Sequence, residues 1–591
     1  MDDPAATRER RRCAPALAER AETATVWLRT HAAALSWAVV ALGALLRLGR
    51  YLDNRSLWLD ESFLAINLLE RSFGDLFDRL DFVQSAPPAF LAIEKGAADL
   101  LGDGELALRA FPFAASLAAL VLFRDVAGRL LPPPAALLAL VLFATNDVLL
   151  YQSAELKQYS SDVAVALALV ALVLRVERAD GNVSRRAFAA LALAGPVAVW
   201  LSFPAAFVLA GIFAALALEV AARRSRELTV ALGVTGAGWL ASFAAMYAVA
   251  SANVGQISSE VFAGADAEPA TTGAANVVHQ AWSSFVNPGG FADGLNGLAA
   301  LLFAVGALSL ARPATLGRLA LLSVPFVLNA LASFLDRYPL GGRYSIFLVP
   351  FLVLLVAHGA ARLTAWSRRP AAVAAALAFF LAAPPLAVAL ADALDPPARE
   401  DVKPLLRTAA AGWQAGDTLF VYRNAQYALR YYTACADCEP SAEDFPWPAR
   451  LAPPSPRGEQ FAPALESVPP SVVVGSQTPG TDPLDDLDRL PERGRVWLLF
   501  AHVSSHDGLD AEALVLRELD RRGRLLERRA ADGARLYRTG DRARWDAAGQ
   551  QVVGARGRGQ GGRRPVGARG CALDDRRSST HLASPGPGGR G

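Results

Sequence analysis

The sequence has 591 residues, of which 53% are hydrophobic and 19% charged, and its mean hydropathy is +0.28. This composition is too apolar for a soluble multidomain protein and predicts a polytopic membrane protein. The formal net charge of +2 is almost balanced and indicates no class of charged partner, and four cysteines are too few for a disulfide framework.

The amino-terminal segment, residues 1–31, carries the basic run RERRR at 8–12 and precedes the apolar stretch Ala32–Leu46. A positive flank without a convincing cleavage site predicts an uncleaved span, with the N-terminus in the cytoplasm. The first outer loop, residues 51–105, would then lie outside. It begins YLDNRSLWLDES, in which the carboxylates Asp60 and Glu61 are adjacent.

The segment Pro87–Leu101 inside this loop is apolar but short. A span needs about 20 residues, and this segment has Glu94 and Lys95 at its centre. We expect an interfacial or re-entrant helix that does not cross the membrane.

Ten further apolar stretches follow, and the loops between them are alternately rich and poor in arginine. By the positive-inside rule they predict, with the first stretch, about 11 transmembrane helices in a domain covering residues 32–391. The ten are Leu106–Phe123, Pro134–Tyr151, Val163–Val176, Ala187–Leu201, Ala205–Ala221, Leu228–Ala250, Asn296–Leu310, Leu319–Phe334, Tyr344–Leu363 and Ala371–Leu390.

From residue 392 to 540 the apolar runs shorten to strand length, as in DTLFVY, SVVVGS, RVWLLF and ARLYRT, with a helix-like stretch at Ala511–Arg521. This pattern predicts an extracytoplasmic α/β domain. Residues 541–591 are rich in Gly, Arg and Pro and predict a disordered tail to which we assign no function and no nucleic-acid partner.

The sequence lacks the characteristic motifs of several common enzyme and nucleotide-binding classes. The sequence has no phosphate-binding P-loop, no dinucleotide-binding glycine fingerprint, no GxSxG and no HExxH. Only His502 and His506 lie close together among six histidines, so we predict no metal site and no certain cofactor, and leave open whether a divalent cation is used. The spacing of Cys435 and Cys438 favours a structural disulfide over a redox pair.

The outer loops and span ends collect ionisable and aromatic residues, which is costly at membrane depth and predicts a functional site. Asp60 lies between Trp58 and Phe63, and such an apolar setting would raise its pKa toward that of a general base if burial outweighs nearby cations. Only three lysines occur among 58 basic residues, namely Lys95, Lys157 and Lys403. In so arginine-rich a chain, a lysine hints that its compact ammonium matters, although chance is an equal alternative.

Two more segments carry candidate residues. If a helix begins at Glu155, then Glu155 and Tyr159 share one face, although snorkelling charges at a helix end are the alternative. Arg343 and Tyr344 lie at the outer end of a span, where they are either an interfacial anchor or a clamp for a lipid phosphate.

Five motifs in order, RSLWLDESFLAINLLERS, QSAPPAFLAIEK, GELALRAFPF, YQSAELKQYSSD and GGRYSIFLVPFLVLL, resemble those of class C glycosyltransferases. The resemblance covers roughly residues 35–365 and is strongest to lipid-linked-sugar transferases related to protein O-mannosyltransferases and lipid A aminoarabinose transferases. It implies a fold of that class. It also implies transfer of a sugar from a polyprenyl-phosphate carrier to a glycan, lipid or protein acceptor on the outer face.

The resemblance also implies residue roles. Asp60, with Glu61 beside it, would act on the acceptor, while Lys157, Arg343 and Lys95 would bind the lipid phosphate, in a site that Tyr344, Glu155 and Tyr159 complete. Aminoarabinose transferases have a Glu-Lys pair directly before a proline of the first outer loop. Here Gln84-Ser85-Ala86 precede Pro87, so aminoarabinose activity does not follow.

We therefore expect a multi-pass glycosyltransferase of the plasma membrane, in contact with membrane lipids, which transfers a hexose or pentose by inversion. The alternative is a transporter or flippase for lipid-linked glycans, but we find no internal repeat and the ionisable residues gather at one face. A scaffold that only anchors the outer domain would tolerate the loss of Asp60 and Lys157.

Overall fold

The computed structural model describes residues 27, 30–176, 183–261, 278–283, 289–291, 294–440, 465, 469–476, 484–491, 494–503, 511–522 and 524–540. The predicted disordered tail, residues 541–591, lies outside these residues, as do His506 and nearly all of the predicted cytoplasmic segment.

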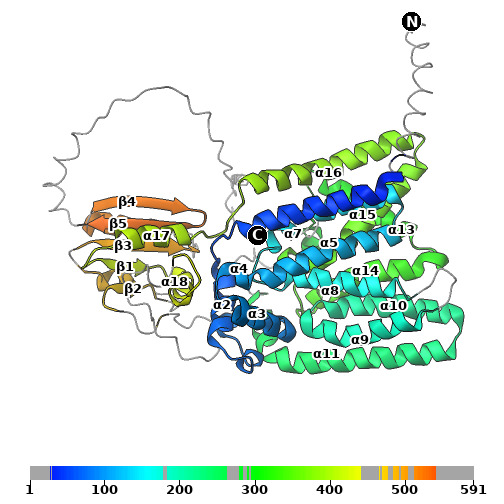
Figure 1. The fold of residues 1–591 in the computed structure, drawn as a ribbon, viewed down its shortest axis with the longest axis horizontal. Helices are drawn as coiled ribbons and strands as arrows, with labels where there is room; N and C mark the ends of the chain where they lie inside the picture. The colour runs from blue at the N-terminus through cyan, green and yellow to red at the C-terminus, as the bar shows by residue number, and fades with distance from the viewer. Residues whose placement is uncertain are drawn as a thin grey trace, which may run out of the picture. The chain divides into compact units, whose positions relative to one another are not determined.

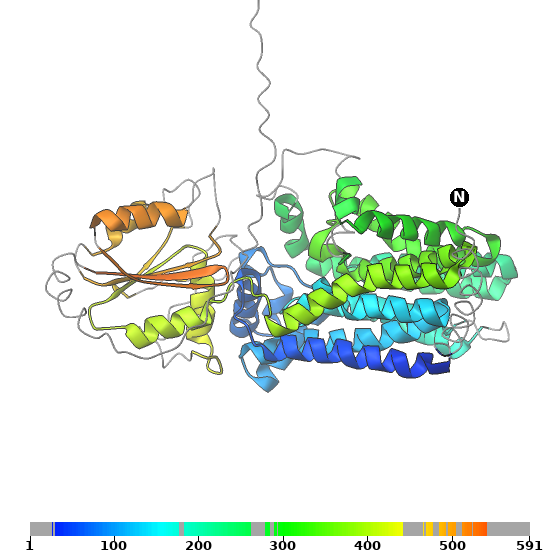
Figure 2. The same ribbon diagram turned by 90° about the horizontal axis from the view of Figure 1, so that it is seen from above.

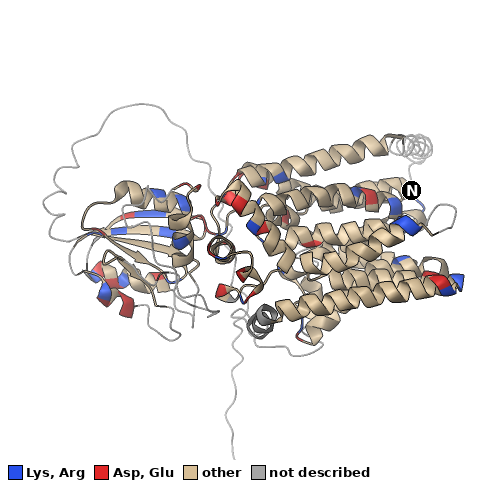
Figure 3. Cartoon of the chain, turned by 60° about the horizontal axis from the view of Figure 1, so that its bottom comes forward, with Lys and Arg blue, Asp and Glu red and all other residues tan. Residues whose placement is uncertain are grey.

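Among the described residues, eleven helices each contain most of one predicted span. Figure 1 shows them side by side in a bundle. They are Thr30–Leu52, α5 (Ala110–Leu130), α6 (Pro133–Ala144), α8 (Tyr159–Val173), α9 (Arg185–Leu201), α10 (Ala205–Arg223), α11 (Arg226–Val261), α13 (Asn296–Ser309), α14 (Leu316–Phe334), α15 (Val349–Trp366) and α16 (Pro370–Leu394). Figure 3 shows long stretches without charged residues along these helices, with Lys, Arg, Asp and Glu mostly toward the helix ends.

Within the described residues, seven helices are long and apolar enough to cross a membrane, and α6, α8 and α13 are shorter apolar helices. The seven are Thr30–Leu52, Ala110–Leu130, Ala205–Arg223, Arg226–Ser251, Pro313–Phe334, Gly342–Trp366 and Pro370–Leu394. The predicted class, a helical polytopic membrane protein with a small carboxy-terminal α/β domain, is therefore confirmed.

Helix α15 is the buried centre of the bundle, packed against α13, α6 and α16. It approaches α13 closely through two glycines, because a Cβ on Gly359 would collide with the carbonyl of Leu302 and a Cβ on Gly306 with that of Leu355. Small residues at such crossings let helix backbones pack in direct contact. Short 3-10 turns precede α14 and α15, at Pro313–Thr315 (η3) and Gly342–Leu348 (η4).

The predicted first outer loop, residues 51–105, folds into short helices that pack on one another. They are α2 (Leu59–Glu70), η1 (Asp75–Phe77), η2 (Asp81–Val83), α3 (Pro88–Leu101) and α4 (Glu105–Leu108). Helix α3 has only 14 residues and is not a candidate span, which agrees with the predicted non-crossing segment. Another short helix, α7 (Asp147–Gln152), lies between α6 and α8.

The carboxy-terminal domain contains one five-stranded sheet with the order β2-β1-β3-β5-β4. Its strands are β1 (Thr418–Val421), β2 (Val472–Val474), β3 (Val496–Ala501), β4 (Arg524–Ala531) and β5 (Ala534–Gly540), and its helices are α17 (Lys403–Gly412), α18 (Ala425–Ala434), η6 (Asp485–Arg489) and α19 (Ala511–Arg522). Strand β1 is parallel to β2 and β3, whereas β5 is antiparallel to β3 and β4. Figure 2 shows α19 on one face and α17 on the other.

The four predicted strands are β1, β2, β3 and β5, and the predicted helix is α19, which ends one residue later than expected. Strand β4, with the sequence RLLERRAA, was not predicted. It pairs only with β5 at the edge of the sheet and is largely exposed, so its charged residues give no apolar pattern to recognise.

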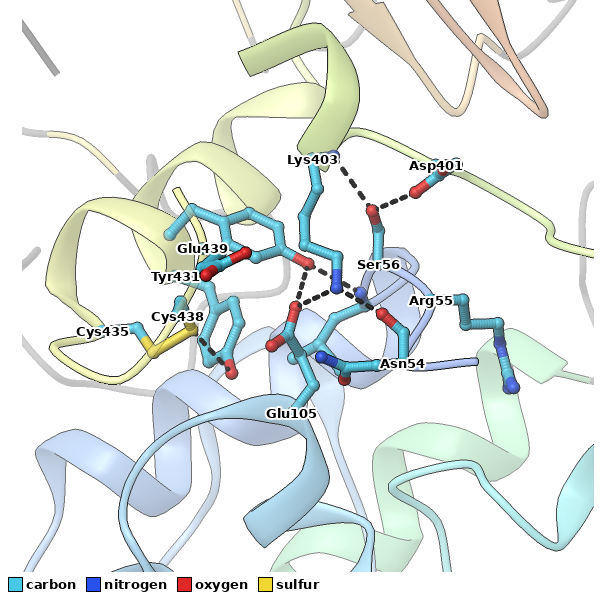
Figure 4. Close-up of polar contacts among 12 residues, drawn as sticks. Asn54, Arg55, Ser56, Glu105, Asp401, Lys403, Tyr431, Cys435, Cys438 and Glu439 are labelled. Atoms are coloured by element: carbon cyan, nitrogen blue, oxygen red, sulfur yellow. Dashed lines mark hydrogen bonds and ion pairs between the residues drawn. A yellow bond between two sulfur atoms is a disulfide. The ribbon is translucent and has the colours of Figure 1, made fainter. Parts of the chain in front are cut away.

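The α/β domain contacts the first outer loop through a polar junction (Figure 4). The Lys403 ammonium lies 3.0 Å from Glu105 Oε1, which also accepts a hydrogen bond of 2.9 Å from the Tyr432 hydroxyl. Ser56 Oγ donates to Asp401 at 2.5 Å and accepts from the Lys403 backbone N–H at 2.9 Å. Nearby, Cys435 and Cys438 form the disulfide that the spacing favoured. This junction fixes the chain immediately before Asp60.

Candidate functional site

Asp60 lies between two cations that come from distant parts of the sequence. Its Oδ1 is 3.2 Å from Lys157 Nζ and its Oδ2 is 2.6 Å from Arg343 Nη1. Asp60 is in the first turn of α2, Lys157 in the turn before α8, and Arg343 in η4. The fold therefore brings together Asp60, which was predicted to be the base, and Lys157 and Arg343, which were predicted to bind the lipid phosphate.

Gln84 completes this group. Its side-chain amide donates to Asp60 Oδ1 at 3.4 Å, and its carbonyl oxygen accepts from Lys157 Nζ at 2.6 Å. It occupies the loop position where the resemblance showed a departure, before Pro87. The neutral Gln84 amide therefore bridges the Asp60 carboxylate and the Lys157 ammonium. We call Asp60, Gln84, Lys157 and Arg343 the Asp60 site.

The neighbouring cations Lys157 and Arg343 set the direction of the pKa shift of Asp60. Burial alone would raise its pKa, but the charges of Lys157 and Arg343, with hydrogen bonds from Lys157 and Gln84, hold the pKa well below its usual range. The sequence predicted a raised pKa only if burial outweighs nearby cations, and at Asp60 the cations outweigh burial. Burial lowers the pKa of Lys157, and Asp60 offsets part of that effect.

Glu61 faces away from these cations and is fully buried. Arg109 binds both of its oxygens, with Nε 2.8 Å from Oε1 and Nη2 2.7 Å from Oε2, and the Leu156 N–H donates to Oε1 at 2.8 Å. Arg109 also donates to the carbonyls of Arg55 and Ser56. Glu61 therefore joins α2, the start of α5 and the turn before α8, which positions Asp60 beside Lys157.

Glu155 is also fully buried and accepts a hydrogen bond of 2.7 Å from Trp58 Nε1. Burial and the neighbouring Glu61 charge raise its pKa, although Arg399, Arg55 and Arg343 act in the opposite direction. Helix α8 begins at Tyr159 and not at Glu155, so the expected shared helix face does not exist. Glu155 instead precedes the helix and anchors Trp58.

Tyr159 and Tyr344 lie close to Arg343 of the Asp60 site. Their rings meet edge to face with centroids 6.3 Å apart, and the Arg343 guanidinium lies 5.5 Å from the Tyr344 ring centroid and 5.6 Å from that of Trp58. Tyr344 therefore contacts Arg343 of the Asp60 site, and Tyr159 contacts Tyr344.

Lys95, which was predicted to bind the lipid phosphate, is not part of the Asp60 site. Among the described residues its ion pair is with Asp99, one turn along α3, at 2.9 Å.

Glu94 is fully buried in α3, and neither carboxyl oxygen has a hydrogen-bond partner among the described residues. Burial raises its pKa well above the ordinary value of 4.5. The folded protein therefore retains a proton on Glu94 over a pH range in which the unfolded chain releases it.

This predicts a pH-dependent effect of Glu94→Gln. Because the native state binds the extra proton, wild-type stability falls as pH rises above about 4.5 toward the folded pKa, and an amide has no such dependence. We expect the melting temperature of Glu94→Gln relative to wild type to increase with pH in thermal unfolding of the detergent-purified protein. Glu219→Gln, at a side chain 44% exposed, is the matched control. A constant difference across pH would contradict the assignment.

Within the part of the chain that the structure describes, no group of three His, Cys, Asp or Glu side chains is arranged to hold a metal ion. Sequence reasoning did not single out Arg109, Arg399 or the bridging role of Gln84. Arg109 lies inside the quoted motif GELALRAFPF and near the start of the predicted span Leu106–Phe123, and an arginine within an apolar span was the signal available.

No protein-family model matches the chain, and no curated protein matches it either. Solved structures are similar to it in fold. ArnT from Cupriavidus metallidurans in the apo state has a TM-score of 0.47 and 13% identity, covering 86% of this chain and 98% of that one. The same protein bound to undecaprenyl phosphate has a TM-score of 0.47 and 12% identity, covering 85% and 97%.

Archaeal oligosaccharyltransferase AglB from Archaeoglobus fulgidus, in complex with an inhibitory peptide and a dolichol-phosphate, has a TM-score of 0.40 and 12% identity, covering 67% of this chain and 63% of that one. ArnT is a lipid A aminoarabinose transferase, and both neighbours are class C glycosyltransferases, the class that the sequence motifs resemble. At these identities the similarity concerns the fold alone.

Proposed function

We propose that this chain is a membrane glycosyltransferase that moves a sugar from a polyprenyl-phosphate carrier to an envelope glycan, lipid or protein on the outer face. The observation that carries the proposal is the Asp60 site, in which one carboxylate contacts two cations at 2.6 and 3.2 Å. All four of its residues lie in the ordered motifs that resemble those of class C transferases, with Gln84 at the start of QSAPPAFLAIEK.

The proposed mechanism is one inverting displacement at the anomeric carbon. Asp60 takes the proton of the acceptor hydroxyl or amine as the acceptor atom bonds to that carbon, and the bond to the phosphate oxygen breaks. A phosphate leaving group carries its own charge, so Lys157 and Arg343 are sufficient to stabilise it and no general acid is needed.

Donor binding would also activate the base. In the structure both cations lower the pKa of Asp60. A donor phosphate that binds Lys157 and Arg343 takes up part of their charge, which weakens their pull on Asp60 and raises its basicity. Glu61 would act through position, since Arg109 and the Leu156 N–H occupy its oxygens.

Replacing either cation should weaken donor-carrier binding. We expect Lys157→Ala and Arg343→Ala each to raise the Kd for undecaprenyl phosphate by about 10- to 100-fold, since a charge-assisted hydrogen bond contributes about 1.5–3 kcal/mol. Native mass spectrometry of the detergent-solubilised protein measures this. Arg337→Ala removes an exposed arginine near Arg343 and should bind like wild type. Unchanged binding in both site variants would contradict the phosphate role.

The class of activity is tested by mass spectrometry of envelope lipids and glycans from cells with and without the gene. A transferase predicts a glycan, lipid or protein that lacks one sugar, together with accumulated polyprenyl-phosphate sugar. Accumulation of a complete lipid-linked glycan on the cytoplasmic side would instead indicate a flippase.

A further inference from the structure

Beside the Asp60 site, three guanidinium groups surround the ring of Tyr151, which is in α7. Their Cζ atoms lie 4.4 Å (Arg55), 4.7 Å (Arg399) and 4.8 Å (Arg50) from the ring centroid. Arg50 is in the last turn of the helix Thr30–Leu52, Arg55 is in the predicted first outer loop, and Arg399 follows α16. The fold therefore collects like charges from three separate segments. We call these three arginines and Tyr151 the Tyr151 cluster.

Two of these arginines, Arg50 and Arg55, are buried and form no ion pair within the described residues. Arg55 is 5% exposed, and both of its terminal nitrogens lack a hydrogen-bond partner among the described residues. Arg50 is 8% exposed and donates from one terminal nitrogen to the Pro397 carbonyl, while its Nε and other terminal nitrogen have no partner there. A buried guanidinium is costly unless hydrogen-bonded and paired, so this arrangement calls for an anion.

The nearby carboxylates Glu61 and Glu155 attract Arg55 through their charge, but within the described residues neither accepts a hydrogen bond from its terminal nitrogens. Glu61 is bound by Arg109 through both oxygens. Glu155 Oε1 accepts from Trp58 and is 3.9 Å from Arg399, beyond hydrogen-bond distance. Asp147 and Asp392 line a small cavity with Arg50 and Tyr151. Asp392 and Asp53 offset part of the Arg50 charge, but within the described residues no ion pair joins Asp147 or Asp392 to Arg50 or Arg55.

Trp58 separates this cluster from the Asp60 site. Arg399 lies 4.4 Å from the Trp58 ring centroid, and Arg343 lies 5.6 Å from it. A guanidinium stacked on an aromatic ring keeps its in-plane N–H groups available for the oxygens of a phosphate or carboxylate. Two groups of cations therefore adjoin one indole. One group contacts Asp60 at 2.6 and 3.2 Å, whereas the other has the longer contact of Arg399 with Glu155 at 3.9 Å.

We propose that the Tyr151 cluster is a second anion-binding subsite, which takes a phosphate or carboxylate group of the acceptor. The assignment to the acceptor rests on the proposed function, whereas anion binding itself does not. A polyprenyl-phosphate sugar has a single phosphate, which the Asp60 site would take. The remaining buried cations then match a negative charge on the other substrate, so the acceptor is an anionic glycan or lipid.

The test of anion binding uses the full-length purified protein saturated with undecaprenyl phosphate, to which inorganic phosphate is added at constant ionic strength. We expect phosphate to raise the melting temperature of wild type and of the exposed-site control Arg337→Gln, but not of Arg55→Gln. Arg55→Lys, which keeps the charge and loses the forked geometry, should show a reduced shift. An equal shift in wild type and Arg55→Gln would overturn the subsite.

Two further arms identify the source of the anion. With an extract of envelope glycolipids as acceptor, Arg55→Gln should raise the acceptor KM about tenfold or more, with a smaller change in kcat.

In the competition experiment, vesicles of phosphatidylglycerol should compete with inorganic phosphate no better than vesicles of phosphatidylcholine. Stronger competition by phosphatidylglycerol would assign the subsite to a membrane lipid headgroup and overturn the acceptor role. A phosphate shift lost in Arg55→Gln, with no sugar transfer by wild type, would refute the proposed function and leave the anion site standing.

Discussion

Asp60→Asn should lower sugar transfer by about 10²- to 10⁴-fold, the range that a positioned general base contributes. The asparagine amide has nearly the same shape but cannot take the acceptor proton. The measurement is transfer of labelled sugar from a polyprenyl-phosphate donor in membrane vesicles that contain equal amounts of wild-type and variant protein.

The same variant should bind undecaprenyl phosphate at least as tightly as wild type. Asp60 competes with the lipid phosphate for Lys157 and Arg343, and its neutral replacement releases both cations. Loss of transfer with retained carrier binding separates a catalytic role from a structural one. Full transfer by Asp60→Asn would show that another group removes the proton.

The second large effect is on stability. Arg109→Ala should reduce the free energy of unfolding by about 3–5 kcal/mol, because it leaves Glu61 buried as an unpaired charge. Burial lowers the pKa of Arg109, but the Glu61 charge and hydrogen bonds more than compensate and raise it above its usual value. We expect a large fall in the melting temperature and in the yield of folded protein from detergent extracts.

Arg129→Ala is the control for that measurement. Arg129 pairs with Asp125 on the surface of α5, with side chains 42% and 30% exposed, and an exposed pair contributes about 0–1 kcal/mol. Similar melting temperatures for Arg109→Ala and Arg129→Ala would contradict the positioning role of the Glu61–Arg109 pair. Glu61→Gln should resemble Arg109→Ala, since the amide cannot form the bidentate ion pair.

The helices were the part of the fold most readily predicted from the sequence. Each apolar stretch had to be helical to satisfy its backbone in a membrane, and arginine-rich loops indicated where one span ended. Helix α3 was recognised as non-crossing because Glu94 and Lys95 interrupt it. Strand β4 was missed because an edge strand need not be apolar.

The candidate site was predicted in part. Asp60, Lys157 and Arg343 were named because ionisable residues near a membrane are costly, and they do meet. Their effect on one another depends on distance, so the sequence could not indicate that the cations would outweigh burial at Asp60. The pairing of Glu61 with Arg109 joins residues 48 positions apart, and no local pattern links them. Contacts from Arg399 depend likewise on how the chain after α16 returns to the first outer loop.

The most direct test of the central claim follows both products of the proposed reaction. Purified wild-type protein in vesicles receives a polyprenyl-phosphate donor labelled in the sugar and in the lipid, together with an envelope extract as acceptor. The proposal predicts that labelled sugar appears on the acceptor and free polyprenyl phosphate appears in equal amount, and that Asp60→Asn gives neither. Intact donor that crosses to the opposite leaflet, with no sugar on any acceptor, would contradict it.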